Sequence, residues 1–169
     1  MPENKCMFCK ISSGEIPSKK VYEDDKVLAF LDINPRNPGH TLVIPKKHYS
    51  TIFEISESEA GELFAKVRKV AGMVNEGTKA QGVSIANSSG QAAGQAVAHA
   101  HFHIIPRFMN EAPPGLECML SPKRFDEQTL DKIAQVISSA RSKTAAEISS
   151  SSDLGSEFAK LENEEDFGF

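Results

Sequence analysis

The chain has 169 residues, of which 40% are hydrophobic and 25% are charged, and its formal net charge is −4. These proportions are typical of one soluble globular domain, and no apolar run reaches the roughly 18 residues of a membrane span. The pattern of a secretory signal is not visible. Three cysteines are too few for a disulfide framework. We therefore expect a cytoplasmic protein, with the nucleus as a further compartment, and neither nucleic acid nor membrane as a partner.

Acidic residues are concentrated at the C-terminus. Residues 145–169 hold seven of the 23 acidic residues and one of the 19 basic residues, so residues 1–144 carry a net charge of +2. The segment is also rich in serine and poor in apolar side chains, which is typical of a chain without its own core. We expect one domain over 1–144 and a mobile acidic tail over 145–169.

The first elements surround a pair of cysteines and a hairpin. Cys6 and Cys9 form a Cys-x-x-Cys pair, whose spacing leaves open a redox dithiol, half of a zinc site or two small buried residues. Residues 21–23 and 26–31 predict two strands around an acidic turn. A loop with two prolines and a glycine follows, and a third strand over 40–45 ends at its proline.

The strongest helix signal begins at Ser56. Ser56 and Glu59 form a Ser-x-x-Glu capping box, and apolar residues follow it at three- and four-residue steps. Gly77 is the expected end of this packing helix. The remaining elements are a fourth strand, a loop of small residues and a C-terminal helix that Asp126 could cap, over 83–87, 88–96 and about 126–141.

Histidine alternates with apolar residues in the stretch 99–105. This alternation predicts a strand that presents His99, His101 and His103 on one face. His99 and His103 would lie roughly 13 Å apart along it, so one zinc ion with bonds of about 2.1 Å cannot hold all three rings. Nucleophilic catalysis is the alternative, because a neutral imidazole is a competent nucleophile at pH 7. His101 is the best candidate, since a ring on each side can orient it or donate a proton.

These ordered motifs resemble those of the histidine triad (HIT) family of nucleotide-binding hydrolases and transferases. His-x-His-x-His followed by two apolar residues is its signature, and the preceding loop can offer backbone N–H groups to a phosphate. The resemblance runs from Cys6 to about Arg107. It implies an α+β fold of the HIT type, with a five-stranded antiparallel sheet, one long packing helix and a C-terminal helix.

The resemblance also implies an activity and the residues that carry it. It indicates an HIT-type hydrolase, an adenosine 5'-monophosphoramidase or a dinucleoside polyphosphate hydrolase. Such an enzyme cleaves at the α-phosphorus of a purine nucleotide through a covalent nucleotidyl-histidine and releases an AMP-type product. The catalytic positions, nucleophile first, correspond to His101, His103, His40 and His99. The nucleotide-binding positions correspond to Phe8, Ile11, Ile16, Asp32, Ile33, Leu42, Asn87, Gln95, Ala96 and Val97.

Departures and branch features refine this expectation. Many family members have serine where this chain has Ala96, so a hydroxyl that could touch the phosphate or the leaving group is missing. His103 favours hydrolysis, because the uridylyltransferase branch carries glutamine at that position. A non-catalytic nucleotide-sensing or scaffold module, with the acidic tail as its interaction segment, is the alternative function.

The branch with an N-terminal Cys-x-x-Cys often binds structural zinc. The matching positions in this chain are Cys6, Cys9, His48 and His99, a tetrahedral set of two thiolates and two imidazoles. Family members commonly dimerise through helices and sheet edges. The resemblance therefore implies a zinc ion as cofactor and a homodimer as the assembly.

Overall fold

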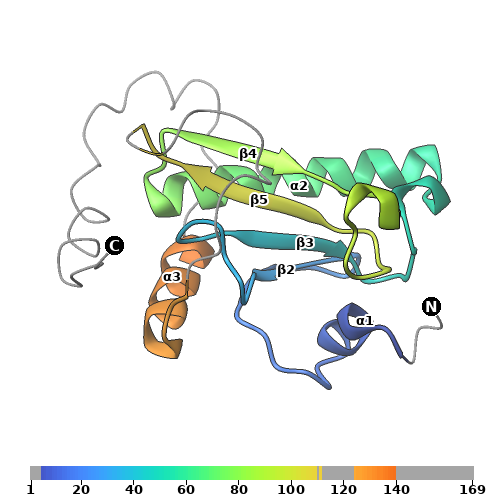
Figure 1. Ribbon diagram of the computed structural model, residues 1–169, viewed down its shortest axis with the longest axis horizontal. Coiled ribbons are helices and arrows are strands. Elements are labelled where there is room, and N and C mark those ends of the chain that lie inside the picture. The colour runs from blue at the N-terminus through green and yellow to red at the C-terminus, as the bar shows by residue number, and fades with distance from the viewer. Residues whose placement is uncertain (1–4, 110, 112–123, 140–169) are drawn as a thin grey trace.

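The computed structural model describes residues 5–109, 111 and 124–139. Its strands are β1 (Lys20–Glu23), β2 (Val27–Leu31), β3 (Thr41–Pro45), β4 (Gly82–Ala86) and β5 (Phe102–Arg107). Its α-helices are α1 (Met7–Ser12), α2 (Glu57–Thr78) and α3 (Glu127–Ser139), and the short 3-10 turns are η2 (Ile52–Glu54) and η3 (Gln91–Ala93). The strands form one antiparallel sheet in the order β1-β2-β3-β5-β4 (Figure 1). The predicted α+β fold is therefore confirmed.

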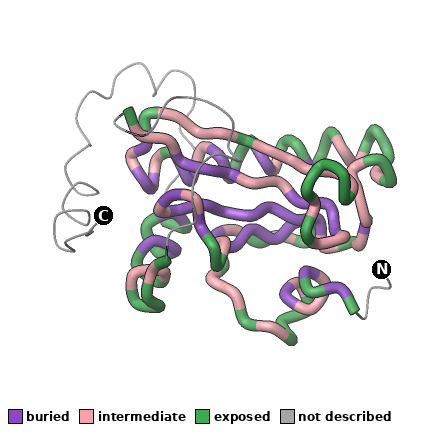
Figure 2. Tube along the Cα trace, viewed as in Figure 1, coloured by how far each residue is buried: buried purple, intermediate pink, exposed green. Residues whose placement is uncertain are grey.

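The central strands are buried on both faces of the sheet (Figure 2). Side chains alternate between the two faces along a strand, so each strand contributes to two cores. The residues that face α2 and α3 in the main core are Val27, Ala29, Leu31 and Val43. Those that face α1 in the second core are Leu28, Phe30, Leu42 and Ile44. The second core positions α1 beside the histidine segment.

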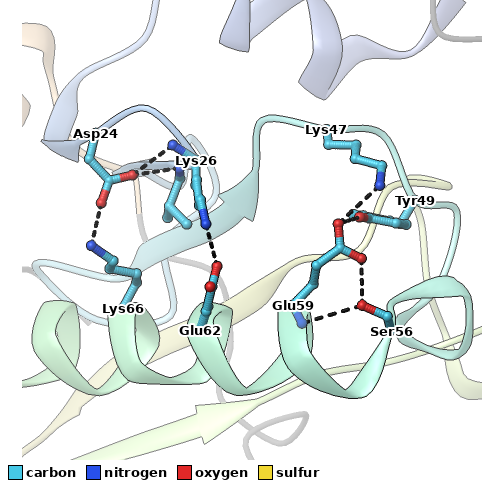
Figure 3. A network of polar contacts seen from close by, with 9 residues as sticks. Asp24, Lys26, Lys47, Tyr49, Ser56, Glu59, Glu62 and Lys66 are labelled. Atoms are coloured by element: carbon cyan, nitrogen blue, oxygen red, sulfur yellow. Dashed lines mark hydrogen bonds and ion pairs between the residues drawn. The ribbon is translucent and has the colours of Figure 1, made fainter.

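The helix α2 begins at the predicted capping box (Figure 3). Ser56 Oγ accepts a hydrogen bond from the Glu59 backbone N–H (3.3 Å) and donates one to the Glu59 carboxylate (2.7 Å). The carboxylate thus reaches the serine hydroxyl, and it also accepts from the Tyr49 hydroxyl (2.7 Å) and from Lys47 Nζ (3.0 Å). Beside this network, two ion pairs join the hairpin turn between β1 and β2 to the same helix. The hydrogen bond to Glu59 holds Tyr49, whose backbone carbonyl accepts the Ala100 N–H (2.7 Å) in the histidine segment.

The end of α2 differs from the prediction. The helix continues through Gly77 to Thr78, and Lys79 follows in the left-handed conformation (φ 54°). A glycine is needed at this helical position because α3 approaches it closely. A Cβ on residue 77 would lie 2.8 Å from the Cα of Ile137. The glycine therefore permits helix–helix contact and does not end the helix.

The helix α3 begins as predicted, because the Asp126 carboxylate accepts the Thr129 N–H (2.8 Å) and caps its first turn. The last residues of the predicted helix, 140–141, and the whole tail over 145–169 lie outside the described residues. The domain boundary and the mobility of the tail stay predictions. Within the described ranges, no helix is both long enough and apolar enough to span a membrane.

Candidate active site and metal centre

The histidine segment leads into β5 and does not lie wholly within it. His103 belongs to the strand, whereas His99 and His101 precede its first residue, Phe102. The rings still share the α1 face. Phe8 of α1 packs edge-on against His99 and His101 at ring-centroid distances of 6.0 and 5.2 Å, and His103 is opposite Leu42 of the second core. The common face is confirmed, but the predicted strand start is too early.

Two side-chain amides hold this segment in place. Asn87 Nδ2, just beyond β4, donates to the His101 carbonyl (2.7 Å). Gln95 Nε2 donates to the Ser50 carbonyl (2.7 Å), and Gln95 Oε1 accepts the Gly90 N–H (2.7 Å). The resemblance assigns phosphate and ribose contacts to Asn87 and Gln95. In this structure both amides bind backbone groups, so they fix the main chain of the site.

The tautomer of His101 follows from one hydrogen bond. His101 Nδ1 lies 2.7 Å from the His99 carbonyl oxygen, which can only accept. The proton of the neutral ring is therefore on Nδ1, and Nε2 carries a lone pair. Burial lowers the pKa of His101, against the opposing effects of this hydrogen bond and of Asp32. A buried, neutral imidazole with an available lone pair is suited to attack an electrophile.

His40 and His103 form a hydrogen-bonded pair beside the nucleophile candidate. The Arg36 backbone N–H donates to His40 Nδ1 (3.1 Å), which places the His40 proton on Nε2. His40 Nε2 lies 2.9 Å from His103 Nδ1, so His103 accepts there and carries its own proton on Nε2. The ring of His103 lies between those of His40 and His101, at centroid distances of 5.1 and 5.0 Å. His103 can therefore donate a hydrogen bond next to His101.

This pair is uncharged at neutral pH. Burial lowers the pKa of His40 to about 4; Asp32 opposes this shift, and His103 and Arg36 add to it. Burial and the adjacent His101 also lower the pKa of His103. Asp32, His40 and His103 bring possible metal-ligand atoms within 4.8 Å of one another. The hydrogen bond between His40 Nε2 and His103 Nδ1 accounts for the short distance between these two rings without a bound ion.

A second cluster brings together all four predicted zinc ligands, although up to 93 residues separate them in sequence. The Sγ atoms of Cys6 and Cys9 lie 3.4 and 3.5 Å from His99 Nδ1. His48 Nδ1 lies 3.3 Å from Cys9 Sγ and 3.2 Å from His99 Nδ1. The α1 helix, the exit of β3 and the approach to β5 thus meet at one group of donors.

These donors fit a tetrahedral zinc ion. Zinc bonds of about 2.1 Å to nitrogen and 2.3 Å to sulfur separate neighbouring ligand atoms by about 3.4–3.8 Å, close to the separations in the cluster. His99 Nε2 donates to the Pro45 carbonyl (2.9 Å). Nδ1 of the neutral His99 ring is then unprotonated and faces the thiols, which is the tautomer that a metal ligand needs.

The apolar candidates for a purine slot gather at the second core. The buried or partly buried members of this group are Phe8, Ile11, Ile16, Leu42 and Val97. Ile33 differs from them, because it is 79% exposed in the loop after β2. Ala96 is exposed in the loop of small residues, which contains no charged side chain over 88–98.

Two contributions to the site lacked a sequence signal of their own. The helix α1 has only six residues, too few for an apolar periodicity, although its Cys-x-x-Cys motif marked the position. The N–H that fixes the His40 tautomer belongs to the backbone of Arg36. Any residue except proline supplies this group, so no residue type marks its role.

The fold and the site define an α+β protein that gathers His40, His101 and His103 and a group of possible zinc ligands on one face of its sheet. The family model of the HIT domain matches residues 13–110, more than half of the chain, and the chain belongs to this family. An uncharacterised HIT-like protein of Methanocaldococcus jannaschii is 53% identical over 103 residues, which cover 61% of this chain and 79% of the relative.

Two further relatives bear on the chemistry. An adenosine 5'-monophosphoramidase of Schizosaccharomyces pombe is 40% identical over 102 residues, which cover 60% of this chain and 74% of the relative. The crystal structure of a Zn-bound histidine triad family protein from Mycobacterium smegmatis is 30% identical, with a TM-score of 0.71. The match covers 97% of this chain and 100% of that chain.

Proposed function

We propose that the protein is a hydrolase that cleaves at the α-phosphorus of purine nucleoside phosphoramidates or dinucleoside polyphosphates through a covalent nucleotidyl-His101. The observation that carries this proposal is the hydrogen bond from His101 Nδ1 to the His99 carbonyl, because it leaves the lone pair on Nε2. Family membership and the similarity to a phosphoramidase support a nucleotide as the substrate.

The reaction takes two displacements at phosphorus. His101 Nε2 attacks the α-phosphorus, the bond from phosphorus to the leaving group breaks, and a leaving nitrogen takes up one proton from solvent to depart as an amine. Water then attacks the nucleotidyl-His101, releases one proton to solvent and breaks the phosphorus–nitrogen bond. The nucleoside monophosphate leaves, and Nε2 regains its lone pair. Throughout, the Nε2 proton of His103 donates a hydrogen bond to the negative charge on the phosphate.

The remaining site residues would hold the nucleotide. The apolar side chains of Phe8, Ile11 and Leu42 belong to the second core. They would form the apolar walls that a flat purine base needs. The Asp32 carboxylate can accept hydrogen bonds from both ribose hydroxyls. In the loop before the histidines, the described residues offer no acceptor for the N–H groups of Ala96 and Val97, so these can bind a phosphate oxygen.

The charge of the loop favours one of the two substrate classes. The loop over 88–98 carries no charged side chain. A polyphosphate leaving group carries several negative charges, which lysine or arginine would best neutralise. An amine leaving group needs no such partner. We therefore expect faster turnover of phosphoramidates than of dinucleoside polyphosphates.

A structural zinc ion would be held by Cys6, Cys9, His48 and His99. The fit of these donors and the likeness to a Zn-bound family member support it. Zinc supplies no step of the reaction. It would tie α1, which carries Phe8, to the segment that presents His101.

A second copy of the chain is the proposed partner. In the described sheet β4 is an edge strand, and Ile85 of β4 is 40% exposed. Phe64 of α2 is 54% exposed beside Phe102. An apolar patch next to an open strand edge is suited to pairing with an identical surface. Sedimentation equilibrium should give the mass of a dimer, and a monomer at micromolar concentration would contradict this proposal. We propose the cytoplasm as the location of the protein, because a reducing compartment keeps the Cys6 and Cys9 thiols available to a metal ion.

A substrate panel tests the function. Adenosine and guanosine phosphoramidates and dinucleoside polyphosphates are assayed with the wild-type protein and with His101→Ala. Turnover by the wild type alone supports the enzyme. No turnover of any substrate by the wild type would favour the nucleotide-sensing or scaffold module, and a version ending at residue 144 would then show whether the acidic tail binds its partner.

A further inference from the structure

The loop between β2 and β3 is anchored by one buried amide. Asn37 is 1% exposed, and its Nδ2 donates hydrogen bonds to the Pro106 carbonyl of β5 (2.8 Å) and to the Glu111 carboxylate. A buried amide is costly unless it is hydrogen-bonded, so these partners hold Asn37 strongly. The loop is therefore tied to the far end of the strand that carries His103.

Glu111 is itself held in a defined position. One carboxylate oxygen accepts from Asn37, and the other accepts from Arg107 Nε (2.9 Å). The side chains of Glu111 and Arg107 are each only 16% exposed, which strengthens a charge-assisted hydrogen bond relative to a surface pair. Glu111 thus bridges β5 and the loop.

The anchored loop delivers two backbone groups to His40. The Asn37 carbonyl accepts the His40 N–H (3.0 Å) and closes the turn. The neighbouring Arg36 N–H donates to His40 Nδ1 (3.1 Å). This second bond determines which nitrogen of His40 carries the proton, and through His40 which nitrogen of His103 does.

A competing arrangement lies close by. Asp32 Oδ2 lies 3.7 Å from His40 Nδ1, and a carboxylate accepts where the Arg36 N–H donates. If the loop segment that carries Arg36 moved away, the proton of the neutral His40 ring could be on Nδ1, which would then donate a hydrogen bond to the Asp32 carboxylate. His40 Nε2 would then accept from His103 Nδ1, and His103 Nε2 would present a lone pair to the substrate. The two states differ in the positions of two protons and in the direction of one hydrogen bond.

We propose that Asn37 and Glu111 are positioning residues that, by holding the Arg36 N–H against His40, keep the Nε2 proton of His103 directed at the reacting phosphate. Their side chains act through the loop: Asn37 Nδ2 binds the Pro106 carbonyl and Glu111, and Glu111 binds Arg107. The tautomers are a property of the folded chain, whereas the benefit to a phosphate rests on the proposed function. A reversed pair would place a lone pair against an anionic oxygen, so phosphate binding would weaken while binding of the base and ribose would persist.

The first test is nitrogen-15 NMR of the His40 and His103 rings at about pH 8, where both are neutral because burial lowers their pKa values. In the wild type and in the control Asn34→Ala, which changes an exposed asparagine of the same loop, His103 Nε2 should be protonated and His103 Nδ1 should not. In Asn37→Ala the His40 and His103 tautomers should become mixed or reversed. Unchanged tautomers in a folded Asn37→Ala protein would overturn the proposal, whether or not the protein is an enzyme.

The second test compares binding of AMP with binding of adenosine. Glu111→Ala should weaken AMP binding at least about tenfold, as expected for a lost hydrogen bond to a charged group, and leave adenosine binding unchanged. Glu111→Gln keeps an acceptor for Asn37 and should retain both the tautomers and the wild-type ratio of affinities. Equal losses of AMP and adenosine binding would indicate a general structural role and contradict the proposal. Turnover is not needed for either test, so failure of the proposed reaction remains distinguishable.

Discussion

The backbone carbonyl oxygen of His99 accepts a hydrogen bond from His101 Nδ1, 2.7 Å away, while the ring of the same His99 faces the thiols of Cys6 and Cys9. One residue therefore connects the proposed zinc centre to the proposed nucleophile. Its side chain is a donor for the metal, and its main chain sets the tautomer of His101. The position of the segment before β5 consequently affects both sites.

Replacing His101 with alanine should remove turnover and keep binding. The loss of a covalent nucleophile typically costs at least about a thousandfold in rate, whereas the apolar slot and Asp32 remain. Steady-state kinetics and calorimetric titration with AMP measure the two effects. Wild-type turnover by a folded His101→Ala protein would exclude the covalent mechanism.

Replacing Cys6 with serine should abolish zinc binding, because the set loses one of its two thiolates. Elemental analysis of the purified protein should give about one zinc per chain for the wild type and a small fraction of that for Cys6→Ser. Cys118→Ser is the matched control, since this third cysteine is not one of the four proposed ligands. Equal zinc contents in Cys6→Ser and wild type would rule out the site.

Acid should destabilise the fold through His40. Its pKa is about 4 in the folded chain against 6.5 ordinarily, because burial disfavours the charged ring. Between these pH values the unfolded chain binds more protons at this position than the folded chain does. The free energy of unfolding is therefore unaffected by His40 above pH 6.5 and falls as the pH drops toward 4. The contribution reaches roughly 3 kcal/mol. Denaturant titrations of wild type and His40→Asn should show a smaller loss for the variant, and equal losses would contradict the assignment.

Two glycine-to-alanine changes should have opposite effects on the free energy of unfolding. Gly39, next to His40, has φ +87°, and a Cβ there would lie 2.5 Å from Thr78 Cγ2. Gly39→Ala should therefore lower the free energy of unfolding by roughly 2–4 kcal/mol. Gly61, on the exposed side of α2, has no atom within 4 Å of its built Cβ, so Gly61→Ala should raise it by about 0.5–1 kcal/mol. A neutral Gly39→Ala variant would show that the loop tolerates movement.

Local patterns predicted the parts of the fold whose cause is local. The capping box at Ser56 and Glu59 marked the start of α2, and the alternation of histidine with apolar residues marked the common face of the triad. Gly77 was misjudged because helix–helix contact depends on the approach of Ile137, more than fifty residues later in the chain. A glycine at a helix end and a glycine beneath a crossing helix look the same in a sequence.

The site divides in a similar way. The zinc ligands came from the resemblance to a family, since spacing alone left the Cys-x-x-Cys pair open among three interpretations. The order of protons along His40 and His103 depends on a backbone N–H and on a buried amide at Asn37. Such contacts are made in three dimensions between unremarkable residue types, so the sequence carried no sign of them.

The stereochemistry at phosphorus tests the central proposal most directly. A substrate with an isotopically chiral α-phosphorus is hydrolysed, and the configuration of the released nucleoside monophosphate is determined. Each in-line displacement inverts the phosphorus, so attack by His101 followed by attack of water predicts overall retention. Overall inversion would show a single direct attack by water and would contradict the covalent nucleotidyl-His101.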